Sequence, residues 1–279
     1  STRMNAAPVI GVAGCGAMGL PMAENLVQGG FDAWGYDVRS INEFGSFHDR
    51  MIMDATTFTS KIDILISVVR DIKQTDDLLF NDQAIMTRDG HPKLVVLSST
   101  LSPRYVVEIE KRLAGQATVV DAPMSGAPYR AREGTLTFMV GGDASSFASL
   151  HPLFEVMGND VHHMGPTGAG AATKVSNNLC AAAGVVAVRR ALAASKEYGI
   201  SQADMLAVMR SSSGSTWYGD NLDKIDWADE GYEPTNTMGI LEKDVSSFVD
   251  ALGGTDSMVA APFEDAILDG IRRMDPLKK

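Results

Sequence analysis

The sequence is poor in cysteine and histidine, and this excludes two classes of protein. Its 279 residues include two cysteines, Cys15 and Cys180, which lie far apart. Small secreted domains held together by disulfides need several cysteines, so this chain is not one of them. The five histidines include one adjacent pair, His162 and His163, and neither HxxxH nor CxxC spacing occurs. We therefore expect no metal site.

Positive charge and long apolar runs are also scarce. The chain carries 24 lysines and arginines against 35 aspartates and glutamates, a net charge of -11. Such a chain repels nucleic acid and anionic membranes, so we expect neither as a partner. The longest apolar run, 179–188, is shorter than the roughly 20 residues that span a bilayer. Residues 1–7 resemble a polar tail without a signal-peptide pattern, and we expect a cytoplasmic protein.

A glycine-rich segment follows a short apolar one near the N-terminus. Residues 8–13 read as a buried strand, 14–19 have the sequence G-C-G-A-M-G, and a helical pattern then ends at 29–30. In a dinucleotide-binding turn the first glycine permits the bend, the second admits the pyrophosphate, and the third lets the helix pack against the strand. A second strand, 33–36, ends at an aspartate about 20 residues further on, as the fingerprint requires. The predicted cofactor-binding residues are Gly14, Gly16, Ala17, Met18, Gly19 and Asp37.

Asp37 indicates which nucleotide binds. Its carboxylate can accept hydrogen bonds from both ribose hydroxyls of NAD, and it would repel the 2′-phosphate of NADP. Arg39 complicates the choice, because an arginine at this position could pair with that phosphate. We predict NAD and leave NADP open.

Strand and helix patterns alternate as far as residue 164. Apolar runs at 62–69, 94–97, 117–120, 135–140 and 161–164 read as strands, with helical patterns at 71–80, from 103, and at 147–157. This alternation is typical of a sheet covered by helices on both faces. Ligands bind past the carboxyl ends of such strands, so Val69, Ser99 and Thr100 become candidate cofactor contacts. For Ser99 or Thr100 alone, simple helix capping is an equal alternative.

The pattern becomes helical from Gly168 onward. Residues 168–198 read as one helix, and further helices are expected at 202–210, 238–252 and 259–274. We therefore predict an α/β fold, with a Rossmann-type dinucleotide-binding domain at 1–165 and an all-helical domain at 166–279 joined by the long interdomain helix. The apolar character of that helix suggests more apolar surface than one subunit covers, so we expect a homodimer or homotetramer.

Three polar residues share one face of the long helix. Lys174, Asn177 and Asn178 stand at i, i+3 and i+4 near its start. Taken alone, they would be polar side chains that reach solvent at the helix end. Beside a dinucleotide-binding turn, they become candidates for a site.

With these residues in view, the chain resembles the β-hydroxyacid dehydrogenase family over about residues 8–275. The resemblance rests on four motifs in the family's order: the glycine-rich opening at 11–26, D-A-P-M-S-G at 121–126, the glycine-led segment with Lys174, and Lys243-Asp244. It implies an NAD-dependent oxidoreductase that interconverts a small anionic 3-hydroxy acid with its semialdehyde or keto form by hydride transfer.

The resemblance also implies residue roles. Lys174 would be the general acid/base, supported by Asn178, and Lys243 would lie near substrate and nicotinamide. A lysine accepts a proton near neutral pH only if its pKa of about 10.4 is lowered by burial or by nearby positive charge. The candidate substrate-binding residues are Ser125, Gly126, Ala127, Asn177 and Lys243.

Departures from the family's pattern leave the substrate open. Ala127 replaces a second glycine, Arg130 could bind an anion or face solvent, and Asn236 could hydrogen-bond to a polar substrate in place of the usual phenylalanine. Two other functions remain. A non-catalytic NAD(P)-binding scaffold would be expected to lack Lys174, and an imine-reducing relative typically carries Asp or Tyr there.

Overall fold

The computed structural model describes residues 7–253 and 261–278, and the chain divides into two compact units, Ser1–Lys174 and Val175–Lys279. The long helix α7 (Ala169–Glu197) crosses this division. Most of the expected polar tail at 1–7 and the first residues of the helix expected at 259–274 lie outside the described residues. The boundary predicted near Gly165 falls shortly before α7 begins.

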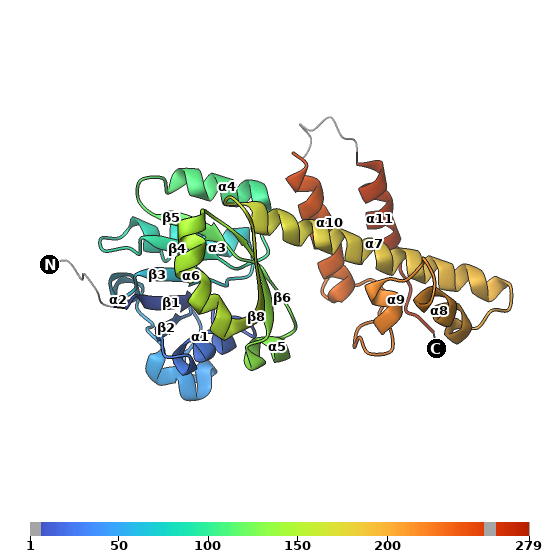
Figure 1. The fold of residues 1–279 in the computed structure, drawn as a ribbon, viewed down its shortest axis with the longest axis horizontal. Coiled ribbons are helices and arrows are strands. Elements are labelled where there is room, and N and C mark those ends of the chain that lie inside the picture. The colour runs from blue at the N-terminus through green and yellow to red at the C-terminus, as the bar shows by residue number, and fades with distance from the viewer. Residues whose placement is uncertain (1–6, 254–260, 279) are drawn as a thin grey trace. The chain divides into compact units, whose positions relative to one another are not determined.

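The first unit is built on one sheet of eight strands (Figure 1). The order is β2-β1-β3-β4-β5-β7-β6, and β8 pairs with β7. The first five strands in this order are parallel, whereas β7 is antiparallel to β5 and β6 and parallel to β8. The strands are β1 (Val9–Ala13), β2 (Asp32–Tyr36), β3 (Ile64–Ser67), β4 (Leu94–Leu97), β5 (Thr118–Asp121), β6 (Met124–Ser125), β7 (Leu136–Gly141) and β8 (Gly158–Gly165).

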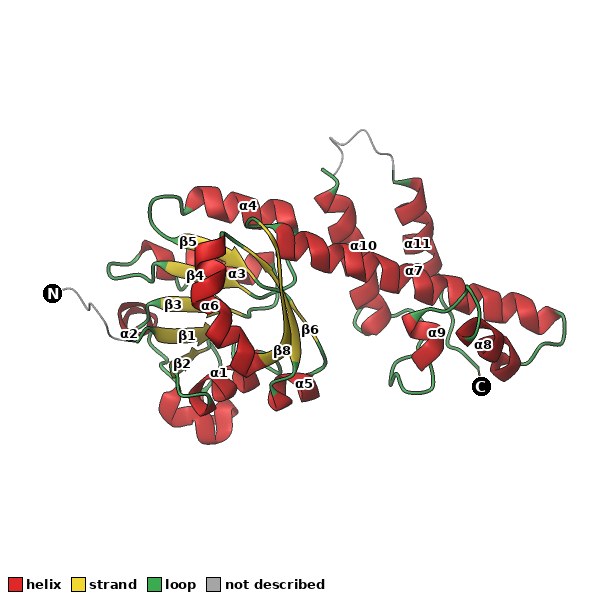
Figure 2. Ribbon diagram, viewed as in Figure 1, coloured by secondary structure: helices red, strands yellow, loops and turns green. Residues whose placement is uncertain are grey.

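Helices cover both faces of the sheet because successive strand side chains point to opposite faces (Figure 2). In β3, Ile64 and Ile66 belong to one apolar core and Leu65 to the other. The first core is closed by η1 (Ile41–Arg50), α1 (Gly19–Gln28), α5 (Pro128–Glu133) and α6 (Ala144–Met157). The second core is closed by α2 (Ala55–Lys61), α3 (Ile72–Leu79), η2 (Ile85–Thr87) and α4 (Pro103–Arg112).

The second unit is helical over its described residues. Its core includes Tyr218, Met238 and Ile271, and the buried Arg189 donates hydrogen bonds to the carbonyls of Ala228, Glu230 and Asp275. Besides α7, its helices are α8 (Gln202–Arg210), α9 (Trp217–Asn221), α10 (Thr237–Ala251) and α11 (Pro262–Arg272). The predicted fold class, a Rossmann-type sheet followed by helices, is confirmed.

The composition of α7 also matches that of a membrane span. Among the described residues, it is the one helix long and apolar enough to cross a bilayer by length and composition. This is weak evidence, because the core helix of a soluble protein meets the same criteria.

Candidate active site

The turn from β1 to α1 contains three glycines whose surroundings differ. A Cβ on Gly14, where φ is +89°, would lie 2.8 Å from the backbone of Val68 and Val69, and one on Gly19 would lie 1.8 Å from the Gly14 carbonyl oxygen. A Cβ on Gly16 would meet nothing within 4 Å. The protein's own backbone therefore explains two of the glycines. The third leaves open space beside the turn, which is what a pyrophosphate approaching the backbone requires.

The N-terminus of α1 opens onto this turn. Its N-cap residue, Met18, makes no side-chain capping hydrogen bond to the described part of the helix, and Gly16 and Ala17 are exposed. The first N–H groups of a helix carry a partial positive charge and bind anions. These features fit the phosphates of a dinucleotide.

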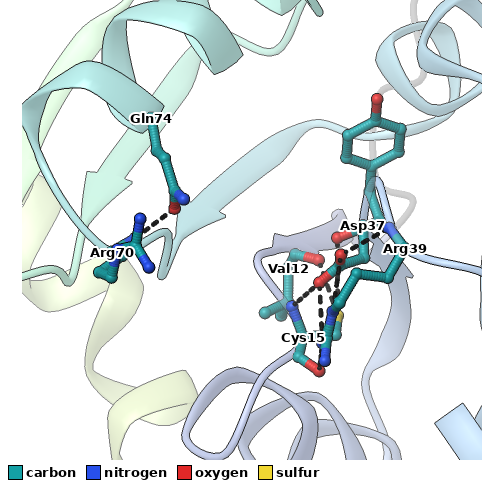
Figure 3. Close-up of polar contacts among 7 residues, drawn as sticks. Val12, Cys15, Asp37, Arg39, Arg70 and Gln74 are labelled. Atoms are coloured by element: carbon teal, nitrogen blue, oxygen red, sulfur yellow. Dashed lines mark hydrogen bonds and ion pairs between the residues drawn. The ribbon is translucent and has the colours of Figure 1, made fainter. Parts of the chain in front are cut away.

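Asp37 follows β2 beside the same turn, and its carboxylate is fully engaged (Figure 3). Its Oδ2 accepts a hydrogen bond from the backbone N–H of Cys15 at 2.9 Å, and its Oδ1 accepts one from the backbone N–H of Arg39 at 3.0 Å. The Arg39 guanidinium pairs with both carboxylate oxygens at 3.2 Å and donates to the Cys15 carbonyl at 2.9 Å. A carboxylate and a guanidinium thus lie together where the ribose of a dinucleotide is expected.

The charge at Asp37 follows from two opposing effects. Burial raises the pKa of this carboxyl group, but the hydrogen bonds from Arg39 and from the Cys15 N–H outweigh burial and hold the pKa below its ordinary value. Asp37 is therefore ionised at neutral pH. Its side chain is 9% exposed, whereas that of Arg39 is 47% exposed and can move without breaking a core. Either the Asp37 carboxylate or the Arg39 guanidinium can therefore hydrogen-bond to a ribose.

Strand ends next to the turn supply the other predicted cofactor contacts. Val69 follows β3, and its N–H group lies against Gly14. Its carbonyl accepts a hydrogen bond from the buried Ser99 hydroxyl beyond β4, whereas Thr100 is exposed. After Val69, the Arg70 N–H donates to the Gln74 side chain at 2.9 Å (Figure 3). Ser99 therefore joins two strand ends, and Thr100 faces away from the core.

The loop with Ser125 and Gly126 is held by Arg130. Ser125 ends β6, Gly126 has a φ of +142°, and a Cβ there would lie 2.9 Å from Leu136 and 3.1 Å from the Arg130 side chain. The Arg130 guanidinium donates to the Ser125 carbonyl at 3.4 Å, to the Thr135 carbonyl and to the Thr137 hydroxyl at 3.2 Å. The guanidinium is therefore bound within the protein, and neither expected alternative, anion binding or exposure to solvent, describes it. It braces the loop.

A second contact joins this loop to the helix of the glycine turn. The Asn25 side chain of α1 donates a hydrogen bond to the Ala131 carbonyl of α5 at 2.7 Å. No role was predicted for Asn25 from the sequence, although a partly buried amide on a mainly apolar helix is a signal that could have indicated one.

The start of α7 is fixed by a buried carboxylate. Asp121, at the end of β5, is 1% exposed, and its two oxygens accept hydrogen bonds from the N–H groups of Gly168 at 2.8 Å and Ala171 at 2.7 Å. Lys174 lies three residues beyond Ala171 and is half-buried. The first unit therefore contains the glycine turn, the Ser125 loop and Lys174.

The remaining predicted residues lie in the second unit. The Asn177 amide donates to Asn178 Oδ1 at 3.2 Å on α7, and Lys243 is exposed on α10. Asn236 caps α10, since its Oδ1 accepts from the N–H groups of Met238 and Gly239 at 3.0 and 3.3 Å. Its Nδ2 donates to the Gly231 carbonyl at 2.8 Å, so the Asn236 amide serves the helix rather than standing ready for a substrate.

A cavity of about 1340 Å³ also lies within the second unit, lined by parts of α7, α8 and the C-terminal segment. None of the predicted site residues lines it. Within residues 7–253 and 261–278, no group of three or more His, Cys, Asp or Glu side chains is placed to hold a metal ion.

Comparison with known families agrees with this geometry. Residues 9–165 match the family described as the NAD binding domain of 6-phosphogluconate dehydrogenase. Residues 168–267 match the family described as NAD-binding of NADP-dependent 3-hydroxyisobutyrate dehydrogenase. The predicted cofactor, NAD with NADP possible, is confirmed at this level.

Individual relatives and a solved structure extend the comparison. An NAD-dependent L-serine dehydrogenase from Pseudomonas aeruginosa is 35% identical over 211 residues, 73% of this chain and 70% of the relative. A 3-hydroxyisobutyrate dehydrogenase from the same organism is 32% identical over 210 residues, again 73% and 70%. The fold matches that of the Mycobacterium tuberculosis 3-hydroxyisobutyrate dehydrogenase solved with L-serine, with a TM-score of 0.79, 24% identity and coverage of 97% of each chain.

Proposed function

The chain belongs to the β-hydroxyacid dehydrogenase family of NAD-dependent oxidoreductases acting on CH–OH groups, and on that premise we propose that it interconverts a small 3-hydroxy acid and its semialdehyde or keto form, with Lys174 as the general acid/base. The reaction class is supported by the relatives, and the structural observation that carries the dependence on a dinucleotide is the pattern of space around the three glycines. The protein fills the space beside Gly14 and Gly19 and leaves it open beside Gly16.

The residues at this turn fit a nicotinamide dinucleotide. The N-terminus of α1 would hold the pyrophosphate, and Asp37 would accept hydrogen bonds from the adenosine ribose. Because Arg39 already occupies both Asp37 oxygens, binding of NAD requires the exposed guanidinium to share them or move aside. When bound, the cofactor accepts or supplies hydride at its nicotinamide ring.

This chain's own residues handle the proton and the substrate carboxylate. We assign the proton transfer to Lys174 Nζ, which takes the hydroxyl proton during oxidation and returns it during reduction. Ser125, Gly126 and Ala127 would receive the carboxylate through a hydroxyl and backbone N–H groups, because Arg130 holds this loop in one conformation. For Asn177, Asn178 and Lys243, the substrate-side roles stay predictions from the sequence.

The substrate class follows from what the relatives share. L-serine and 3-hydroxyisobutyrate are both small acids with a hydroxyl on the third carbon, and they differ in the group on the second carbon. Ala127, where relatives usually carry glycine, narrows the loop that would receive the carboxylate. We therefore propose a short 3-hydroxy acid as the substrate and leave the group on its second carbon to experiment.

The Lys174→Met variant tests the mechanism. Methionine keeps most of the side-chain volume but cannot carry a proton, so turnover of a 3-hydroxy acid should fall roughly 100- to 10,000-fold. NADH affinity, measured by fluorescence titration, should stay within about twofold because the glycine turn is unchanged. The control is Lys111→Met, which removes an exposed lysine from α4 and should leave turnover unchanged. Normal turnover by Lys174→Met would remove the lysine from the mechanism.

A substrate panel tests the reaction class. 3-Hydroxyisobutyrate, L-serine, L-threonate, their oxidised partners and a cyclic imine should each be assayed with NAD(H) and NADP(H). At least one hydroxy acid should be turned over, with NAD preferred, and the imine should not be reduced. Reduction of the imine alone would identify an imine reductase, and NADH binding without any turnover would favour a scaffold.

We also propose that the protein acts in the cytoplasm as a homodimer or homotetramer. Sedimentation at micromolar concentration checks the assembly, and a monomer there would contradict it.

A further inference from the structure

We propose that Asp121 is a positioning residue for Lys174: its buried carboxylate holds the first turn of α7, and the lysine one turn further along, against the carboxyl end of β5. This inference rests on the proposed acid/base role of Lys174. Neither the family resemblance nor the comparisons assign a role to Asp121.

The contacts converge on one turn of helix. Asp121 Oδ1 accepts a hydrogen bond from the Gly168 N–H at 2.8 Å, and Oδ2 accepts one from the Ala171 N–H at 2.7 Å. The neighbouring Thr167 hydroxyl donates to the Val119 carbonyl at 2.8 Å, also on β5. The chain just before and just inside α7 is thus tied to a single strand at three points.

Glycines allow the carboxylate to come this close. A Cβ on Gly141 would lie 2.4 Å from Asp121 Oδ1, and a Cβ on Gly170 would lie 3.0 Å from Oδ2 and 2.2 Å from the Met139 carbonyl. Gly168 has a φ of +99°, which other residues rarely adopt. The glycines at the start of α7 therefore allow the helix to pack closely against β5 and β7.

The first turn of α7, which Asp121 holds, sets the position from which the Lys174 side chain projects. Gly170 and Ala171 precede Lys174 by four and three residues, which places them on its side of the helix one turn earlier. The Cα–Cβ bond of a helical residue tilts toward the N-terminus, so the Lys174 side chain starts out over the turn that Asp121 holds. A shift of this turn would therefore move the lysine with it.

The cap of α7 differs from two other helix caps of the protein because it is a buried carboxylate. Burial raises the pKa of Asp121, and the N–H groups of Gly168, Ala171 and Gly170 offset only part of that effect. Asp143 caps α6 at the surface, where hydrogen bonds from the N–H and hydroxyl groups of Ser146 lower its pKa. Ser201 caps α8 without any charge. The buried carboxylate at α7 carries a desolvation penalty that the other two caps avoid, and the proposed positioning of Lys174 gives a reason for it.

The same short segment also carries the proposed carboxylate site. Asp121 and Ser125 are four residues apart, on β5 and β6, and both strands pair with β7. One segment thus fixes the helix that bears the proton-transfer group and the loop that would receive the substrate. Their spacing is set by the sheet.

The test compares two capping aspartates in the full-length protein. Asp121→Asn replaces one acceptor oxygen by an N–H group that faces another N–H, so the first turn of α7 should move. We expect kcat per NADH-binding site to fall roughly 100-fold, the loss typical of a misplacement of about 1 Å. KM and the NADH dissociation constant should change by less than about threefold, since the Ser125 loop and the glycine turn remain. The control, Asp143→Asn, should leave kcat unchanged and shift the melting temperature by at most a few degrees, because asparagine caps a helix about as well as aspartate.

A second variant covers the case in which Asp121→Asn does not fold. Gly168→Ala keeps Asp121 but strains the turn at a φ of +99° and brings a methyl group within 3.0 Å of Val107. It should show the same pattern, a lower kcat with unchanged NADH affinity, but a smaller loss of several-fold.

The outcomes separate this inference from the proposed function. Wild-type kcat per NADH-binding site in folded Asp121→Asn or Gly168→Ala would overturn the inference, and so would a parallel loss of NADH affinity, which indicates general damage. If instead Lys174→Met retains turnover, the proposed function fails whatever the Asp121 variants do.

Discussion

Two helices, α1 and α7, begin within the first unit after glycine-rich segments, and their positive N-terminal ends are used in opposite ways. At α7 the protein supplies the negative charge itself, through Asp121. At α1 the first turn has no capping side chain among the described residues, and Gly16 faces open space. Both ends attract anions. The N–H groups at the start of α7 already bind the Asp121 carboxylate, whereas those at the start of α1 are available to a ligand.

The difference shows that glycine content does not distinguish the two ends. The contacts that a Cβ would make distinguish them. At Gly170 the Cβ would meet a carbonyl and a carboxylate of the protein, whereas at Gly16 it would meet nothing within 4 Å. A glycine whose Cβ would clash with the protein is required for packing, whereas a glycine with open space at the start of an uncapped helix allows a ligand to approach.

The largest expected effect comes from filling a crowded position. In Gly19→Ala the new Cβ would lie 1.8 Å from the Gly14 carbonyl oxygen, and neither backbone segment can move without shifting α1 from β1. The free energy of unfolding should fall by more than about 4 kcal/mol, the range of the most severe substitutions. Urea unfolding measures it. A variant as stable as the wild type would show that the turn can accommodate a methyl group, and would contradict the distinction between crowded and open glycines.

An intermediate effect is expected from the open position. Gly16→Ala has room for its methyl group, so the free energy of unfolding should stay within about 0.5 kcal/mol of wild type. NADH should bind at least about tenfold more weakly, a loss of about 1.4 kcal/mol, because the methyl group occupies the approach of the pyrophosphate. Fluorescence titration and urea unfolding of the same sample check both. Unchanged affinity would place the phosphates elsewhere.

The smallest effect concerns the two aspartates beside these helix ends, whose pKa values shift in opposite directions. The Asp37 pKa is lowered, so its stabilising contribution is present above its ordinary pKa and is lost as the pH falls through the lowered value. The Asp121 pKa is raised, so the cost of its charge is present above the raised value and disappears as the pH falls. Compared with the wild type, Asp37→Asn should become relatively less stable as the pH rises from 3 to 7.

Asp121→Asn should show the opposite trend over the same range. For Asp37 the size should be about 1 kcal/mol or less, because its partner Arg39 is half exposed. Urea unfolding across the pH range measures both slopes. Slopes of the same sign would mean that the two carboxylates do not differ in the way their surroundings imply.

Much of the fold could be predicted from local sequence because local patterns carried the information. The apolar run at 94–97 coincides with β4, and the helix expected at 202–210 coincides with α8, which Ser201 caps. Several short elements were not predicted. The two residues of β6 form a strand through pairing with β7, and α2, rich in threonine, depends on the Asp54 cap and on the buried Phe58.

In the candidate site, too, local features could be predicted and contacts between distant residues could not. The glycine turn and Asp37 could be predicted, because a fixed spacing reports a local turn and the strand that follows it. The uses of Arg130, Asn25 and Asp121 could not, since each depends on a partner brought near by the fold. The Asp121 carboxylate bonds to N–H groups 47 and 50 positions away, and no periodicity in the sequence reports such a pairing.

The hydrogen bonds that hold the Ser125 loop indicate where the substrate specificity of such an enzyme could be altered. Arg130 holds the Ser125 carbonyl before residues 127–129 and Asn25 holds the Ala131 carbonyl after them, whereas Ala127, Pro128 and Tyr129 are exposed. Evolution, or a protein engineer, can exchange these three side chains without disturbing either anchor. Under the proposed function, which assigns the substrate carboxylate to this loop, a library randomised at 127–129 is a natural starting point for altering the range of acids accepted.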